Sequence, residues 1–402
     1  MGVSDRYINT EIGLFPIDWR IMPFDSIGEV RGRVGWKGYT KMDLRSFGPY
    51  TIGAKHIDQN CKLDLSDATH LSLEKYLQSP EIFVRKDDVL IVQRGTIGKI
   101  VMIEEDIGNA TINPSMLIMR MKEASPKFVY YYFISKSGQD QILMDTSSTG
   151  VPMITQKQVK NFKIPLPPLP EQKAIAEVLS DTDNLIKTLE KQIEKKRLIK
   201  QGAMQKLLSP KGDWQEGTIE EIADVLDNLR IPLNEEQRNK MKGHIPYCGA
   251  NGVMDYVNDF VIDDDIILMA EDGGYFDEYK TRPIAYRMKG KCWVNNHAHI
   301  LKATDTIDQD FLFYSLVHKN ILENISSGTR SKLNKGELLK IIIQFPSSKV
   351  QQRRISEVLI DADNLIDGLN LKLIKYRTIK QGLMQNLLTG KIRLKQGMKD
   401  VT

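Results

Sequence analysis

The chain has 402 residues, of which 41% are apolar and 27% charged, and its net charge is +4. These values are typical of a protein with two to four globular domains, and they exclude a membrane-spanning chain and a strongly basic non-specific nucleic-acid binder. Three scattered cysteines at no metal-binding spacing predict a reducing, cytoplasmic setting and no structural zinc.

Residues 1–163 form the first predicted globular block. An apolar run after Asp88 predicts a strand that ends near Gly95, and Phe128–Ile134 predicts an aromatic helix, so strands and helices are mixed. Basic, polar and aromatic residues at predicted loops are the types that contact phosphates and base edges. The candidates in this block are Arg31, Arg33, Trp36, Lys37, Lys55, His56, Arg94, Thr96, Lys99 and Thr149. Each one taken alone is equally compatible with an ordinary surface side chain.

Residues 164–211 contain the first of two long predicted helices. Pro165, Pro167, Pro168 and Pro170 prevent this helix from extending backwards along the chain. Apolar residues spaced three and four apart predict a coiled-coil seam. The seam residues are Leu179, Ile186, Leu189, Ile193 and Leu207. A helix over residues 172–208 would be about 55 Å long, which exceeds an ordinary core helix.

Residues 212–342 form a second block that echoes the first. An acid-led apolar strand, Asp265–Ala270, precedes Gly273, and Phe311–Val317 predicts an aromatic helix. Candidate nucleic-acid contacts are Asn251, Lys280, Arg282, His297, Thr329, Arg330 and Lys332. The block has a net charge of −7, so any nucleic-acid-binding surface must keep the acidic residues on other faces.

The second block also contains the only enzyme-like pattern in the sequence. The acids Asp263–Asp265, Glu271, Asp272 and Glu278, together with Lys280, imitate a Mg²⁺-dependent nuclease site. The alternative is a strand that begins and ends with acidic residues. His297 and His299 would share one face of a strand, but no cysteine or acid lies beside them in sequence, so hydrogen bonding or packing is expected. No metal site and no catalytic residue are predicted.

Residues 343–402 contain the second long helix and a C-terminal tail. Segments 172–208 and 352–388 align without a gap, and 21 of their 37 positions are identical. The second seam consists of Leu359, Ile366, Leu369, Leu373 and Leu387. The chain is therefore a tandem duplication of globule and helix. The expected fold is α+β, with two globular domains separated by two long antiparallel coiled-coil helices under a pseudo-twofold axis.

Several motifs in this arrangement resemble those of the DNA-specificity (S) subunit of type I restriction–modification systems. They are Ile164–Lys173 before the first helix, the two I-K-Q-G-x-M-Q-x-L-L helix ends, Arg94–Lys99, Pro246–Gly252 and Asn295–His299. The resemblance covers essentially the full chain. Residues 345–352 depart from it, because the second helix lacks the proline-rich P-P-L-x-E-Q entry.

The resemblance implies a non-catalytic subunit that binds double-stranded DNA. Each globule would read one half of a split target, and the helices would set the spacing and dock two methyltransferase subunits. S-adenosylmethionine, ATP and Mg²⁺ would be bound by the methyltransferase and restriction subunits, and none by this chain. Two other classes stay open: a coiled-coil protein-binding scaffold without DNA, and a Mg²⁺-dependent nuclease.

Overall fold

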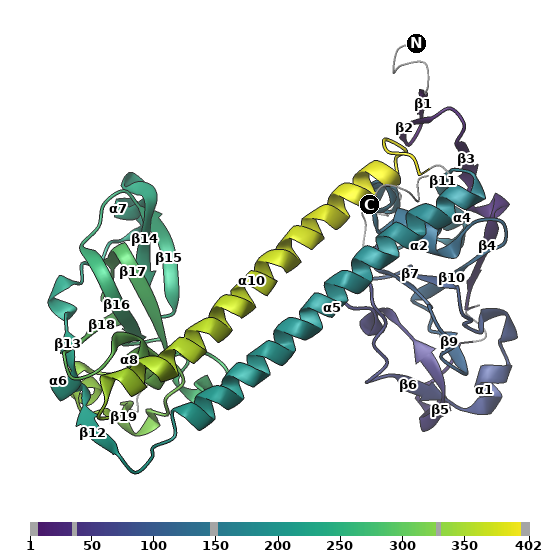
Figure 1. The fold of residues 1–402 in the computed structure, drawn as a ribbon. Helices are drawn as coiled ribbons and strands as arrows, with labels where there is room; N and C mark the ends of the chain where they lie inside the picture. Colours follow the sequence, from purple (N-terminus) through teal and green to yellow (C-terminus); the bar gives the residue numbers. More distant parts are fainter. Residues whose placement is uncertain (1–6, 34–37, 145–151, 327–330, 395–402) are drawn as a thin grey trace. The chain divides into compact units, whose positions relative to one another are not determined.

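A computed structural model describes residues 7–33, 38–144, 152–326 and 331–394. The chain forms two compact units, one made of residues 1–190 and 372–402 and the other of residues 191–371. Each unit therefore contains one globule and half of each long helix (Figure 1).

The first globule combines short strands with four helices among its described residues. Its strands are β1 (Tyr7–Thr10), β2 (Gly13–Pro16), β3 (Arg20–Pro23), β4 (Gly28–Gly32), β5 (Leu44–Ile52), β6 (Thr69–Leu71), β7 (Val89–Val92), β8 (Ile100–Met102), β9 (Ala110–Ile112), β10 (Met116–Met121) and β11 (Lys163–Leu166). Its helices are α1 (Leu73–Leu77), α2 (Pro126–Ile134), α3 (Lys136–Met144) and α4 (Gln156–Asn161). The main sheet has the order β4-β10-β7-β8, and β6-β5-β9 form a second sheet.

Strand β7 is apolar along its whole length because both faces of the main sheet are covered. Val89 and Ile91 pack in a cluster with Phe128 of α2, whereas Leu90 and Val92 pack on the other side with Ile52. Alternate residues of a strand point to opposite faces, so a strand between two cores must be apolar at every position.

The second globule is built around a six-stranded sheet with the order β13-β18-β16-β17-β14-β15. Its strands are β12 (Trp214–Thr218), β13 (Ala223–Val225), β14 (Lys242–Gly249), β15 (Gly252–Val257), β16 (Ile262–Ala270), β17 (Ala285–Val294), β18 (Ala298–Ala303) and β19 (Ile342–Pro346). Its helices are α6 (Ile219–Ile222), α7 (Glu235–Lys240), α8 (Gln309–Leu316) and α9 (Lys335–Leu339). The mixed α+β character predicted from the sequence is confirmed.

The long helices are α5 (Leu169–Leu207) and α10 (Lys349–Leu387). Both begin inside the segments predicted to hold them, because Lys163–Leu166 and Ile342–Pro346 form strands that pair with β3 and β12. Within the first unit Arg377 pairs with Glu190 and Lys380 with Asp183, so the two helix halves run antiparallel. The predicted division of the chain at residues 163, 211 and 342 stays a proposal, since the compact units cut through both helices.

The predicted seam residues are all buried or half-buried. Those that are buried are Leu179, Ile186, Leu189, Ile193, Leu359, Ile366, Leu373 and Leu387, and those that are half-buried are Leu207 and Leu369. Removing such apolar rows from water is what stabilises long amphipathic helices in pairs.

Candidate nucleic-acid interface

The same hydrogen-bonded turn follows β9 in the first globule and β17 in the second. In the first, Asn113 N–H donates to the carbonyl of Ile52 at 2.8 Å, and its side-chain Oδ1 accepts from Ser115 N at 2.9 Å. In the second, Asn295 N–H donates to the carbonyl of Cys248 at 3.0 Å, and its Oδ1 accepts from His297 N at 2.8 Å.

The equivalence continues into the residues that follow β7 and β16. Gln93 N–H donates to the Ser115 carbonyl at 2.8 Å and its carbonyl accepts from Ile154 N at 2.9 Å. Glu271 N–H likewise donates to the His297 carbonyl at 2.9 Å, and its carbonyl accepts from Leu333 N at 2.7 Å. We call this shared arrangement the strand-end frame. It consists of residues 93–95, 113–115 and 152–154 in the first globule, and 271–273, 295–297 and 331–333 in the second.

Glycines let the chain leave each strand-end frame in the same way. Gly95 and Gly273 have φ angles of +89° and +65°, which side chains with a Cβ rarely adopt. The residues just before them, Arg94 and Asp272, occupy equivalent places but carry opposite charges.

In the first globule Arg94, in the strand-end frame, and Thr96, just after it, are both exposed. The Arg94 guanidinium contacts the Met153 Sδ at 3.7 Å, a weak acceptor that leaves its donors available for a phosphate or a guanine edge. Lys99 lies at the other end of the same turn and donates from Nζ to the Ile57 carbonyl at 2.7 Å.

The other predicted contacts of the first globule are engaged within the protein. Arg31 pairs with Glu29, and Lys55 pairs with Asp67 at 2.8 Å. Arg33 is buried and donates to the Ile112 carbonyl at 3.1 Å, which indicates a structural role. His56 is also buried; burial lowers the pKa of its ring, and its Nδ1 accepts from Gly53 N at 2.9 Å. Trp36, Lys37 and Thr149 lie outside the described residues.

In the second globule three predicted residues converge on the strand-end frame. Asn251 donates from Nδ2 to the Gly273 carbonyl at 2.9 Å, and the His297 Nδ1 lies 2.7 Å from Asp272 Oδ1. Lys332 reaches the Glu271 carboxylate at 2.9 Å. Thr329 and Arg330 lie outside the described residues.

Lys280 and Arg282 contact residues other than those of the strand-end frame. Arg282 stacks on Tyr275, with its guanidinium carbon 3.1 Å from the ring centroid. Lys280 borders a cavity of about 620 Å³ between the second globule and the helix halves of its own unit, which His318 and Gln201 also line.

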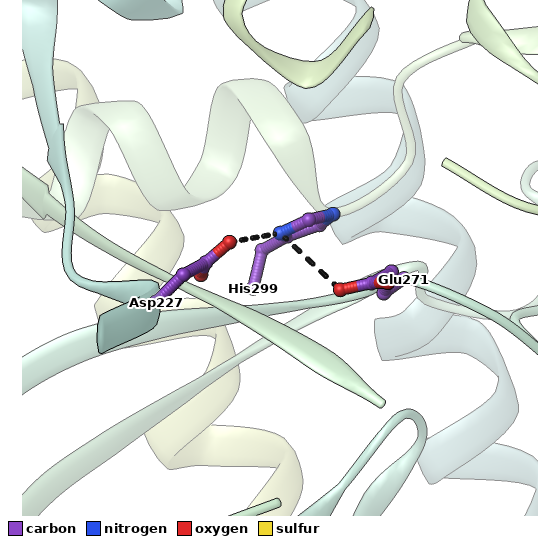
Figure 2. Close-up of side chains that lie close together, drawn as sticks. All are labelled: Asp227, Glu271 and His299. Carbon is purple, nitrogen blue, oxygen red and sulfur yellow. Dashed lines mark hydrogen bonds and ion pairs between the residues drawn. The ribbon is translucent and has the colours of Figure 1, made fainter. Parts of the chain in front are cut away.

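Glu271 of the second strand-end frame is part of a buried charged cluster (Figure 2). The His299 ring points between two carboxylates, with its Nδ1 2.7 Å from Asp227 Oδ2 and 3.9 Å from Glu271 Oε2. Its Nε2 lies 2.8 Å from the Leu333 carbonyl oxygen. Both ring nitrogens of His299 therefore have an oxygen atom within hydrogen-bond distance.

Two cations complete the charge balance of this cluster. Arg230 pairs with both carboxylates, and Lys332 pairs with Glu271. Burial raises the pKa of Asp227 and Glu271, but their hydrogen bonds to His299, Arg230 and Lys332 outweigh it and hold both pKa values below the ordinary range. The side chains of Asp227, Glu271 and His299 could together ligate a metal ion, since their ligand atoms lie within 4.8 Å of one another. As folded, however, each carboxylate is already neutralised by protein cations.

Sequence reasoning did not single out Asp227 and Arg230 and assigned His299 only a packing or hydrogen-bonding role. They lie about 70 residues from His299 in sequence, with no shared motif, so only the pairing of β13 with β18 could reveal the cluster. The nuclease alternative does not assemble. Asp264 pairs with Lys302 and Asp265 with Arg287 near the start of β16, whereas Glu271 follows its end. Glu271 lies eight residue steps after Asp263, roughly 26 Å along the strand at 3.3 Å per step.

Each globule is joined to a long helix by a buried glutamine. Gln172 of α5 accepts at Oε1 from Ser125 N, at 2.9 Å, and donates from Nε2 to the Pro167 carbonyl. Gln352 of α10 accepts at Oε1 from Asp308 N, at 2.7 Å, and donates to the Pro346 carbonyl. Ser125 and Asp308 are the N-cap residues of α2 and α8, so the same contact anchors the aromatic helix of each globule.

The duplicated globules, joined by duplicated helices and carrying equivalent polar turns, define a two-site binding protein. The family model described as "Type I restriction modification DNA specificity domain" matches residues 16–196 and 211–375, most of the chain. The chain belongs to this family and carries two such domains. No helix among the described residues is long and apolar enough to cross a membrane.

Individual relatives agree with the family assignment. The type I restriction enzyme MjaVIII specificity subunit of Methanocaldococcus jannaschii is 28% identical over 79% of this chain and 82% of its own length. The putative MjaX specificity subunit of the same organism is 26% identical over 98% of both chains. The fold resembles the type I restriction-modification S subunit of M. genitalium, with a TM-score of 0.64 and 20% identity, over 92% of this chain and 96% of that one.

Proposed function

We propose that this chain is the DNA-specificity subunit of a type I restriction–modification complex and that each globule reads one half of a bipartite target. The observation that carries the proposal is the strand-end frame, which is built from the same hydrogen bonds twice and presents different side chains each time. A constant backbone with variable polar side chains is what two different base sequences require.

The second globule lies in a block with a net charge of −7, which would repel DNA unless the acids near the strand-end frame are paired. Glu271 is paired with Arg230 and Lys332, and Asp272 Oδ1 lies 2.7 Å from His297 Nδ1, so each of these acids has a partner within the protein. In the first globule Arg94 supplies an exposed cation directly. Both surfaces can then approach a phosphate backbone without a large repulsive term.

The helices offer the same exposed surface twice, which supports docking of two copies of one partner. Ile199 and Ile379 are 53% and 38% exposed, and Leu185 and Leu365 are 37% and 46% exposed. Apolar residues that are repeated yet left in solvent favour a protein contact. We assign these surfaces to two methyltransferase subunits, which would bind S-adenosylmethionine, while restriction subunits would bind ATP and Mg²⁺. This chain itself would contribute no catalytic group.

Methylome mapping of cells that contain the chain and its methyltransferase partner tests the proposal. Arg94→Ala should relax one half of the methylated motif and Lys332→Ala the other, each costing about 1–3 kcal/mol of binding if the side chain contacts a base. Lys136→Ala and Lys240→Ala remove an exposed lysine from each globule away from the strand-end frame and should leave the motif unchanged. If both strand-end variants relaxed the same half, the two-reader proposal would be wrong.

A further inference from the structure

A second contact joins the aromatic helix of each globule to a long helix. In the first unit the Tyr131 hydroxyl of α2 donates to Asp183 Oδ2 of α5 at 2.8 Å. Together with the Gln172 contact to Ser125 N, this bond attaches α2 to α5 at two points. Two points of attachment fix the direction of one helix relative to another, whereas one point leaves a pivot.

The other long helix completes this contact. Lys380 of α10 places its Nζ 2.6 Å from Asp183 Oδ1 and 5.9 Å from the centroid of the Tyr131 ring. We call Tyr131, Asp183 and Lys380 the first triad. It joins three segments, the globule, α5 and α10, through one carboxylate.

The second unit repeats the triad with the roles of the helices exchanged. The Tyr314 hydroxyl of α8 donates to Asp363 Oδ2 of α10 at 2.7 Å. Lys200 of α5 places its Nζ 2.5 Å from Asp363 Oδ1 and 5.4 Å from the Tyr314 ring centroid. Asp183 and Asp363, like Lys200 and Lys380, occupy matching positions of the helical repeat.

The triads are suited to holding geometry. Their lysines are only 20% and 23% exposed, so each ion pair is partly shielded from solvent. Hydrogen bonds to a charged carboxylate are short and directional. Burial raises the pKa of both tyrosine hydroxyls, so they remain donors at neutral pH. Sliding one helix by a turn, about 5.4 Å, would separate the lysine from the aspartate.

We propose that each triad is the registration point that holds its globule at one angle on the two helices, and that it thereby restricts the complex to one spacer length between the half-sites. The inference rests on the proposed function. One base pair of spacer is a rise of about 3.4 Å, so a small change in the angle of a globule is enough to reach a neighbouring spacing. The bases read by each strand-end frame would be unaffected, because the triads lie outside it.

The test is methylome mapping of the full chain with its methyltransferase partner, in parent cells and in cells carrying Tyr131→Phe. This change removes one hydroxyl and keeps the ring. Targets with a spacer one base pair longer or shorter should gain methylation at least about tenfold, the ratio expected from losing a hydrogen bond to a charged group. Tyr130→Phe is the matched control, because this neighbour on α2 donates to Cys61 within the globule.

Tyr314→Phe in the second unit should widen the range of methylated spacer lengths in the same way, and the double variant should widen that range further. A single unchanged spacer in Tyr131→Phe and Tyr314→Phe would overturn the inference. So would loss of methylation at every spacing, since the triads would then serve folding. Lys380→Asp alone should widen the range of spacer lengths that are methylated. The reversed pair, Asp183→Lys with Lys380→Asp, should bring that range back towards a single length. Absence of any bipartite motif in the parent would instead refute the proposed function.

Discussion

The two globules carry different side chains at one pair of equivalent strand positions beside the strand-end frame. In the first, Leu117 lies opposite Gly32 and is buried among apolar side chains. In the second, extending the pairing of Val225 with Leu301 by two residues brings Asp227 opposite His299. One backbone position thus holds a leucine over a glycine in one globule and an imidazole over a carboxylate in the other.

Glycine at position 32 is required by this packing, because a Cβ there would lie 2.5 Å from the Leu117 Cδ2. Where His299 replaces the leucine, Asp227 occupies the place of the glycine and its carboxylate lies within hydrogen-bond distance of the imidazole. Gln93 and Glu271 differ in the same sense, neutral in one globule and charged in the other. The charged cluster is therefore one of two ways to hold the strand-end frame in place, since the first globule forms the same frame hydrogen bonds without such a cluster.

Breaking the cluster should have the largest effect. His299→Ala leaves Asp227 buried without its main partner and should destabilise the second unit by about 3–5 kcal/mol, as measured by denaturant unfolding. Grafting the first globule's solution, Asp227→Gly with His299→Leu, should recover most of that loss because well-packed apolar residues often replace a buried ion pair at little cost. A graft no more stable than His299→Ala would show that the two positions are not equivalent.

The reciprocal change tests the apolar solution. Leu117→His places an imidazole in an apolar core opposite Gly32, where no carboxylate lies, and should destabilise the first unit by about 1–3 kcal/mol for the unsatisfied polar group. Leu117→Met keeps the volume and should cost less than about 1.5 kcal/mol in the same measurement. Equal stability of the histidine and methionine variants would contradict the assigned burial of Leu117.

The smallest expected effect is the pH dependence of the stabilisation that the Glu271 carboxylate gives to the second unit. The folded-state pKa of Glu271 lies below its ordinary value of 4.5, so its carboxylate stabilises the second unit fully above that pH. That contribution is lost as the pH falls through the lowered pKa. The stability difference between the parent and Glu271→Gln should therefore shrink on acidification, whereas Glu236→Gln, on the surface of α7, should differ little from the parent at any pH. A difference independent of pH would mean that the Glu271 charge does not contribute.

The duplication, the two long helices and the class of protein could all be predicted from the amino-acid sequence. Those features are local or periodic: the ungapped repeat, the rows of apolar residues such as Leu179 and Ile186, and prolines that stop a helix. It also predicted the strand before Gly95 and the aromatic helices, because a continuous apolar run and an aromatic helical pattern each follow from neighbouring residues.

Which polar side chains are buried beside the strand-end frame and which are exposed on it could not be predicted from the sequence, because this depends on the tertiary structure. Arg33 and Arg94 look alike in sequence, yet one is buried against strand carbonyls and the other is exposed beside a thioether. Asp227 meets His299, and Lys380 meets Tyr131, across long stretches of chain. Such pairs depend on strand register and helix packing, and the free energies that fix them come from burial and hydrogen bonding between residues remote in sequence.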